Sequence, residues 1–230
     1  MYSNKRKIVI TGASGLIGNK IIESLGQEYD ILPLDKTLGH DLTNEDFVKT
    51  WFADNKDLSG MIVCHAFNPL PLEETKKIEP IDQSLEELRD FYEVNVVSAF
   101  NVCRHYIKNN AGGSVINVSS LYGLNSPKHN IYNNFTKPIG YSLTKSSIIL
   151  MTKYLSTYYA PKYRFNTVVL GGVYDKRFDK SFVIGYNSNV PFGRMMNIEE
   201  TPGIFKFLLS KDSSYATGAV FTIDGGWTAW

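Results

Sequence analysis

Short strand-like runs alternate with helix-like segments along this chain, and the alternation restricts how it can fold. The strand-like runs cover residues 7–11, 30–34, 60–64, 114–118, 165–170 and 219–223. The helix-like segments cover residues 17–25, 44–55, 85–110, 140–159 and 198–209. Parallel strands that are joined through helices form a sheet with helices on both faces. The sequence therefore predicts an α/β fold built on one doubly wound parallel sheet.

A glycine-rich turn follows the first predicted strand and opens the first predicted helix. Its residues are Thr11, Gly12, Ala13, Ser14, Gly15, Leu16, Ile17 and Gly18. Glycines in such a turn let the backbone approach a pyrophosphate closely, and the helix N-terminus supplies amide donors to it. We therefore expect residues 1–230 to form a single Rossmann-type domain that binds a dinucleotide.

An acidic residue, Asp35, ends the second predicted strand. Its carboxylate can accept hydrogen bonds from both hydroxyls of a ribose and would repel a 2′-phosphate, so the sequence favours NAD over NADP. The neighbouring Lys36 could offset that repulsion. Asp41 and Leu42 are expected to flank the adenine. Only five residues separate Asp35 from Asp41, too few for a helix and a strand, so we expect the sheet to be shortened at this edge.

The composition narrows the choice of partners. The chain has 24 basic and 23 acidic residues and a net charge of +1, so neither a nucleic acid nor a membrane surface is expected as the main partner. The N-terminal residues lack the apolar stretch of a signal peptide, which favours a cytoplasmic protein. Cys64 and Cys103 are expected to be buried thiols, and neither has metal-ligand spacing to the four histidines. The expected partner is a small-molecule substrate.

Tyr141 and Lys145 lie four residues apart in a predicted helix and therefore share one helix face. A tyrosine has an ordinary pKa of about 10 and is a poor base near neutral pH unless a neighbouring cation lowers that pKa. Such a pair is common on amphipathic helices. Its place downstream of a dinucleotide-binding turn favours a role in proton transfer.

Several short motifs in a fixed order give the chain a resemblance to the short-chain dehydrogenase/reductase family over nearly its full length. They are the turn at residues 11–18, Asp35, Asp41–Leu42, Asn95, residues 116–120, 141–145, 171–173, 191–194 and 223–226. The resemblance implies a catalytic tetrad of Asn95, Ser120, Tyr141 and Lys145. It also implies cofactor contacts from His65, Ala66, Gly172 and Val173.

The resemblance further assigns a role to each member of the tetrad. Tyr141 would exchange a proton with the substrate oxygen while hydride passes to or from the nicotinamide. Lys145 would lower the pKa of Tyr141 and bind the nicotinamide ribose, and Ser120 would hold the substrate oxygen. Asn95 would bind a water that connects Lys145 to solvent.

Three segments without regular patterning, residues 67–84, 121–139 and 174–197, are expected to form the walls of a substrate pocket, because each follows a strand end of the parallel sheet. Twenty residues separate Ser120 from Tyr141, more than the family commonly has between these positions. We expect Ser120, Asp175 and the polar residues of this insertion, His129, Asn133 and Asn134, to contact substrate. A polar pocket suits a sugar or sugar-nucleotide derivative, and the insertion is similar to family members associated with surface-sugar and flagellin glycan biosynthesis.

Two other readings remain open. A sugar-nucleotide epimerase or dehydratase would retain its cofactor and return the hydride. A catalytically silent dinucleotide-binding sensor or partner subunit would need neither Tyr141 nor Lys145. The resemblance also implies a homodimer or homotetramer, with subunits paired through the long helix at residues 85–110, the helix after Gly140 and the C-terminal residues 226–230.

Overall fold

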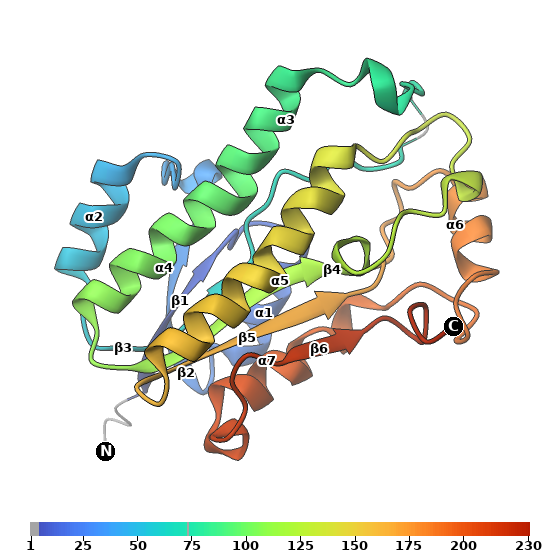
Figure 1. Cartoon of the computed structure of the whole chain (residues 1–230). Helices are drawn as coiled ribbons and strands as arrows, with labels where there is room; N and C mark the ends of the chain where they lie inside the picture. The colour runs from blue at the N-terminus through green and yellow to red at the C-terminus, as the bar shows by residue number, and fades with distance from the viewer. Residues whose placement is uncertain (1–4, 73) are drawn as a thin grey trace.

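The sheet of the protein is parallel and six-stranded in the computed structural model, which describes residues 5–72 and 74–230. Its strands are β1 (Arg6–Thr11), β2 (Tyr29–Leu34), β3 (Leu58–Val63), β4 (Gly113–Ser120), β5 (Tyr163–Leu170) and β6 (Val220–Ile223). They lie in the order β2-β1-β3-β4-β5-β6 (Figure 1). The strand order reverses between β1 and β3, and ligands of such sheets bind at the carboxyl ends of the strands beside this reversal. The predicted doubly wound fold is confirmed.

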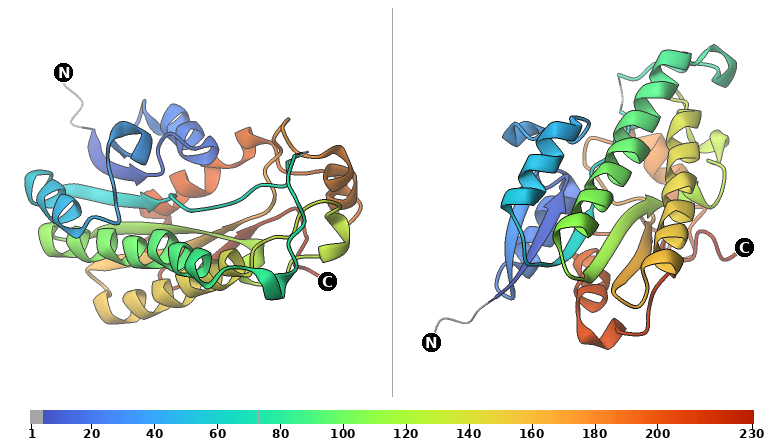
Figure 2. Two further views of the ribbon diagram at one scale, coloured as in Figure 1. Left: turned by 90° about the horizontal axis from the view of Figure 1, so that it is seen from above. Right: turned by 60° about the vertical axis from the view of Figure 1, so that its left-hand side comes forward.

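Helices cover both faces of the sheet (Figures 1 and 2). They are α1 (Leu16–Leu25), α2 (Glu45–Asp54), α3 (Leu85–Tyr92), α4 (Ser98–Asn109), α5 (Ile139–Tyr159), α6 (Lys180–Asn187) and α7 (Pro202–Leu209). One core lies between the sheet and α2, α4 and α5, where Phe52, Tyr106 and Leu155 are buried. A second core packs α1 and α7 against the other face through Ile21 and Phe205. In the part of the chain described, none of the helices combines the length and the apolar character needed to cross a membrane.

The sheet ends at β2, as the short spacing between Asp35 and Asp41 predicts. A single 3₁₀ turn, Lys36–Leu38, follows β2, and α2 then leads directly to β3. Asn44 begins α2, and its side chain accepts a hydrogen bond from the Phe47 amide at 3.0 Å. The connection is therefore too short to add a strand at this edge.

The long helix predicted for residues 85–110 is interrupted. It consists of α3, a π-helical turn at Glu93–Val97 and α4. Such a turn inserts an extra residue, which rotates the side chains that follow it, and π turns often occur at functional sites. Asn95 lies in this turn and is 2% exposed. The hydrophobic periodicity did not show the interruption.

The prediction that residues 174–197 are irregular is wrong in part, because they contain α6. The side chain of Asp179 begins this helix by accepting a hydrogen bond from the Phe182 amide at 3.0 Å. The helix has only eight residues and includes Gly185, where a Cβ would lie 3.0 Å from Ile131 Cβ, a tight contact. A helix this short gives little periodicity in the sequence.

The three irregular segments meet at the carboxyl edge of the sheet. Leu72 and Phe178 form an antiparallel bridge, and the Asp179 amide donates a hydrogen bond to the Pro71 carbonyl at 3.1 Å. The side-chain amide of Asn133 donates to Ser181 Oγ at 2.6 Å. Segments that are more than a hundred residues apart in sequence therefore form one continuous wall.

Candidate active site

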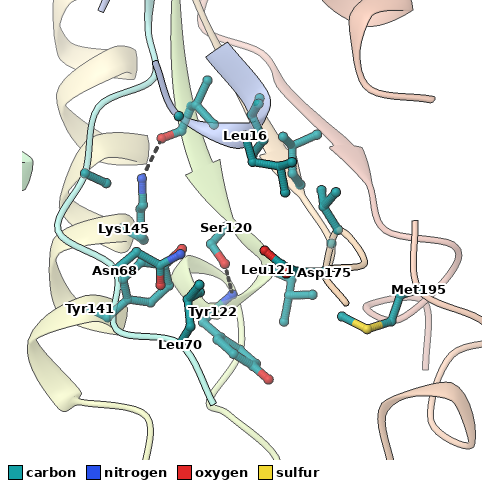
Figure 3. Close-up of a pocket in the computed structure, with 18 of the residues that line it drawn as sticks. Leu16, Asn68, Leu70, Ser120, Leu121, Tyr122, Tyr141, Lys145, Asp175 and Met195 are labelled. Atoms are coloured by element: carbon teal, nitrogen blue, oxygen red, sulfur yellow. Dashed lines mark hydrogen bonds between the residues drawn. The ribbon is translucent and has the colours of Figure 1, made fainter. Parts of the chain in front are cut away.

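A cavity of about 330 Å³ opens at the carboxyl ends of β1, β4 and β5 (Figure 3). The glycine turn forms one side of it, and strand ends and α5 contribute the chemically active side chains. Residues from all three irregular segments complete the wall. Figure 3 shows Leu16 at one end of the cavity and Asn68, Leu70 and Tyr122 towards the other.

The glycine turn is packed so closely that side chains are excluded from it. Gly12 has a φ of +67°, and a Cβ there would lie 2.6 Å from the His65 amide nitrogen. A Cβ on Gly18 would lie 2.1 Å from the Gly12 carbonyl oxygen. Gly15 precedes α1 without a side-chain cap, so the first amides of the helix keep their donors for a ligand. Gly12, Gly15, Leu16, Ile17 and Gly18 all line the cavity. This side fits a pyrophosphate.

Asp35 lies at the end of β2 and closes the turn. Its carboxylate accepts hydrogen bonds from the Ser14 amide at 3.1 Å and from the amide and hydroxyl of Thr37 at 2.9 and 2.8 Å. Partial burial acts to raise the pKa of Asp35, but the hydrogen bonds from Thr37 and Ser14 outweigh it and lower the pKa. The carboxylate is thus ionised at neutral pH, where it can accept from a ribose and repel a phosphate.

Five predicted cofactor contacts are not among the residues that line this cavity: Ser14, Asp35, Asp41, Leu42 and His65. The Asp41 carboxylate accepts hydrogen bonds from Thr43 at 3.0 and 2.7 Å, and Leu42 is buried in the core beneath α2 and α4. The ring of His65 is held by the hydroxyls of Thr11 and Ser98, both at 2.7 Å. Burial lowers the pKa of His65 to about 4, so the ring is neutral. The His65 side chain therefore links Thr11, at the end of β1, to Ser98 of α4, and its backbone packs against Gly12.

Tyr141 and Ser120 face the cavity from α5 and from the end of β4. Ser120 Oγ accepts a hydrogen bond from the Tyr122 amide at 3.2 Å, which fixes the serine at the strand end. Burial raises the pKa of Tyr141 to about 12, and the Ser120 hydroxyl acts in the opposite direction. Without a bound cofactor, the effect of burial on the pKa of Tyr141 is larger than any lowering of that pKa by Lys145. Tyr141 is therefore a protonated phenol at neutral pH.

Lys145 lies one turn along α5 from Tyr141, as the spacing predicts. Its Nζ donates to the Val118 carbonyl at 3.0 Å and is 5.8 Å from the centroid of the Tyr141 ring (Figure 3). Ser119 fixes the backbone of the lysine by donating to the Lys145 carbonyl at 2.7 Å. Burial lowers the pKa of Lys145 to about 8. The ammonium is thus held in the cavity by one neutral oxygen, the Val118 carbonyl.

Asn95 supports the site from the π turn. Its side-chain oxygen accepts from the Phe67 amide at 2.6 Å, and its nitrogen donates to the Phe67 carbonyl at 3.2 Å and to Thr144 Oγ1 at 3.0 Å. These bonds fix the start of residues 67–84 against α5. The structure gives Asn95 this scaffolding position next to the residue that precedes Lys145.

The substrate end of the cavity differs from the expected polar pocket. His129, Asn133 and Asn134 are exposed and do not line it, because Tyr132 and Phe135 point inward and turn their neighbours to the surface. Asp175 does line it, together with Ala66, Gly172 and Val173, but Arg177 binds the Asp175 carboxylate at 2.6–3.1 Å. The remaining wall is chiefly aromatic and apolar and includes Leu70, Tyr122, Tyr132, Phe178, Phe182 and Met195.

Comparison with known proteins agrees with this geometry. The model of a family described as enoyl-(acyl carrier protein) reductase matches residues 4–228. A short-chain dehydrogenase from Leptospira borgpetersenii, solved with bound NAD+, superimposes with a TM-score of 0.85 and is 28% identical. That match covers 97% of this chain and 93% of the other. The chain belongs to the short-chain dehydrogenase/reductase family.

Relatives in this family have diverse names. An NADP-dependent (R)-specific alcohol dehydrogenase of Lentilactobacillus kefiri is 28% identical over 97% of this chain and 87% of its own length. A glucose and ribitol dehydrogenase of carrot (Daucus carota) is 32% identical over 65% of this chain and 50% of its length. A post-translational flagellin modification protein A of Campylobacter coli is 30% identical over 53% and 48%. The match spans only about half the length of several such relatives.

Two residues of this short-chain dehydrogenase/reductase escaped the sequence analysis. Lys137 is 7% exposed, lines the cavity and places its Nζ 3.9 Å from the centroid of the Tyr141 ring. Asn68, which also lines the cavity, accepts a hydrogen bond from that Nζ at 2.5 Å. A signal for Lys137 was present, since it precedes Tyr141 by the same four residues that separate Tyr141 from Lys145. It was missed because it lies before the predicted start of the helix.

Proposed function

We propose that the protein is an NAD-dependent oxidoreductase that interconverts a secondary alcohol and a ketone. The observation that carries this proposal is one cavity in which the glycine turn meets Ser120, Tyr141 and Lys145, while Asp35 is bonded to the Ser14 amide of the same turn. A dinucleotide laid from Asp35 across the start of α1 would bring its nicotinamide to Tyr141. NAD, when bound, supplies the carbon that accepts or donates a hydride.

Different residues of the chain would bind different parts of the dinucleotide. The free amides at the start of α1 would bind the pyrophosphate, Asp35 would bind the ribose hydroxyls, and Asp41 and Leu42 would lie towards the adenine. Gly172 and Val173 would close the nicotinamide end. The preference for NAD over NADP would follow from the ionised Asp35 carboxylate.

Proton transfer would run through Tyr141. With a pKa raised to about 12, the phenol holds a proton that it can give to a ketone oxygen, and Ser120 would hold that oxygen. In the oxidation direction Tyr141 must accept the proton as a phenolate. The positive charges of Lys145 and of the oxidised nicotinamide would then favour the phenolate. Asn95 would position this pair through its contacts with Phe67 and Thr144.

For the substrate we propose a sugar or another polyhydroxylated molecule. Support comes from the carrot relative named for glucose and ribitol and from the flagellin-modification relative. The aromatic wall is compatible with this class, because sugar rings carry apolar faces that pack on aromatic side chains.

A substrate screen tests the proposal. Purified protein with NAD would be supplied with simple alcohols, aldoses, alditols and nucleotide sugars, and NADH would be followed by absorbance. We expect net NADH formation with a polyhydroxylated compound and its loss in Tyr141→Phe. Tyr154→Phe, a change at an exposed tyrosine on the same helix, is the matched control. Activity confined to fatty-acyl compounds would refute the substrate class, and full activity of Tyr141→Phe would refute the mechanism.

A homodimer built through α4 and α5 completes the proposal. Leu150, Tyr154 and Tyr158 of α5 are 70–72% exposed, and Phe100 of α4 is 44% exposed. They form an apolar surface of the kind that is covered by a second subunit. The C-terminal residues contribute less than expected, since Trp227 is buried against Tyr186, whereas Trp230 is 75% exposed.

A further inference from the structure

The side chain of Lys137 is placed to meet the substrate rather than the cofactor. Its Nζ donates to Asn68 Oδ1 at 2.5 Å and to the Pro69 carbonyl at 2.8 Å, both in the segment at residues 67–84. Asn68 lies towards the end of the cavity opposite to Leu16 and the glycine turn (Figure 3). The ammonium also lies against the ring of Tyr141. A group bound by Lys137 would therefore sit beside an atom held at the Tyr141 hydroxyl.

Within residues 5–72 and 74–230, Lys137 is bonded only to neutral oxygens. An ammonium has three donors, and the contacts with Asn68 and Pro69 use two of them. Asp175 is the one carboxylate among the described residues that line the cavity, and Arg177 binds both of its oxygens. The cavity thus contains two buried lysines and no carboxylate free to neutralise them.

A buried charge without a counterion is unfavourable, and proteins rarely retain one unless a ligand makes use of it. Lys137 is only 7% exposed, so attraction between its ammonium and an anion would be stronger than on the surface. Lys145, the other buried lysine of the cavity, is assigned to the nicotinamide ribose in the proposed function and donates to Val118. Lys137 is therefore a buried cation of the cavity that a substrate anion can neutralise, whereas Arg177 is already paired with Asp175.

We propose that Lys137 binds a carboxylate of the substrate, close to the carbon that is oxidised or reduced. This inference rests on the proposed function and narrows it to hydroxy acids or keto acids of the polyhydroxylated class. A carboxylate is favoured over a phosphate because one ammonium, assisted by the Asn68 amide, balances a single negative charge. Phosphate dianions are usually held by several cations or by a row of backbone amides.

Binding of a carboxylate and its neutral counterpart can test the assignment without turnover. D-gluconate and D-glucitol differ in one terminal group, and each would be titrated calorimetrically into protein saturated with NADH. Glycerol 3-phosphate forms a third arm. The proteins would be the wild type, Lys137→Met, Lys137→Arg and Lys153→Met, the last of which removes an exposed lysine of α5. Circular dichroism and melting temperature would establish that each variant is folded.

We expect the wild type and Lys153→Met to bind D-gluconate about tenfold or more tightly than D-glucitol, because hydrogen bonds to charged groups contribute about 1.5–3 kcal/mol. Lys137→Met should bind both compounds equally, and Lys137→Arg should retain part of the preference. Three results would overturn the proposal: no preference in the wild type, including no binding of either compound; an undiminished preference in Lys137→Met; or stronger dependence on Lys137 for glycerol 3-phosphate. Failure of the proposed function would give a different result. The wild type would then form no NADH in the substrate screen but would still bind D-gluconate more tightly than D-glucitol.

Discussion

Replacing Lys137 with methionine should make the unliganded protein more stable. The lysine side chain is 7% exposed, and burial, aided by the nearby charge of Lys145, lowers its pKa from 10.5 to about 7. Folding therefore moves this ammonium into surroundings that disfavour its charge. Methionine is similar in length and flexibility and carries no charge, so it can fill the same space without that penalty.

The size of the effect follows from the pKa difference between the folded and unfolded chain. At about 1.4 kcal/mol per pH unit, a fall from 10.5 to about 7 corresponds to a penalty of about 3–5 kcal/mol at pH 7. Methionine loses the hydrogen bonds to Asn68 and Pro69, and two partly exposed bonds of this kind contribute together about 1–3 kcal/mol. A net gain of about 1–3 kcal/mol is expected, which would raise the melting temperature by a few degrees in a domain of this size.

How the stability difference between Lys137→Met and the wild type changes with pH shows whether the buried charge causes it. Below pH 7 the ammonium is charged in both folded and unfolded protein, so the penalty is constant and the variant has its full advantage. Between pH 7 and 10.5 the folded lysine is neutral while the unfolded one still binds a proton, so the wild type gains stability as pH rises. Chemical denaturation at intervals from pH 6 to pH 10 should therefore show the two proteins converging. Lys153→Met should track the wild type throughout.

A Lys137→Met protein that is less stable than the wild type at pH 6–7 would refute this reasoning. So would an advantage that does not change with pH, because that would indicate improved packing rather than the removal of a disfavoured charge. Lys137→Gln separates these outcomes further, since it removes the charge but can still donate a hydrogen bond to Asn68.

Other predictions concern the cofactor, the proton and the subunit interface. Tyr141→Phe should lower turnover by roughly a hundredfold to ten-thousandfold with little change in NAD affinity, because it removes only the proton donor. Asp35→Ser should reduce the preference for NAD over NADP by about tenfold or more in catalytic efficiency, since it removes repulsion between two anions. Gly18→Ala should abolish the rise in melting temperature on adding NAD, because a Cβ would lie 2.1 Å from the Gly12 carbonyl and displace α1. Tyr154→Glu should convert a dimer into monomers in analytical ultracentrifugation, since the side chain is 70% exposed on the proposed interface.

Each of these has a clear contrary result. Weakened NAD binding in Tyr141→Phe would mean that the phenol holds the cofactor rather than the proton. An unchanged cofactor preference in Asp35→Ser would place discrimination at another residue, such as Lys36. Gly18→Ala with normal NAD binding would show that α1 can shift at little cost. A monomeric wild-type protein would remove the interface altogether.

The parts of the site that lie on regular elements could be predicted from the sequence. Gly12 and Gly18 belong to a strand-turn-helix unit, and Ser120 ends a strand, so local pattern fixed their places. Tyr141 and Lys145 were placed by helical spacing. Each of these sequence patterns is local, because it depends only on residues that lie close together in the sequence. The roles assigned to these residues remain to be tested by the variants above.

The predictions that failed depend on packing between distant segments. His129 and Asn133 are polar residues in an insertion, but Tyr132 and Phe135 bury themselves against Phe182 and turn the polar residues outward. The histidine at position 65 follows a strand, yet Thr11 and Ser98 hold its ring between β1 and α4. The sequence shows which side chains are polar. It does not show which of them are turned away from the cavity when a neighbouring aromatic side chain packs into the core.

The proton-transfer residues and the residues that contact substrate therefore lie on different kinds of structural element in this protein. The proton-transfer residues lie on β4 and α5, two adjacent elements whose relative position is fixed by the sheet. The substrate wall is assembled from loop segments that are distant in sequence, joined for example by the bridge between Leu72 and Phe178 and the bond from Asn133 to Ser181. The strands of the sheet do not include these segments, so substitutions in the wall can reshape the pocket while the strand β4 and helix α5 stay in place. Lys137 links the two parts, since it binds the wall through Asn68 and lies against Tyr141. Substrate preference should consequently respond to changes around Lys137 more than to changes in the polar residues of the insertion.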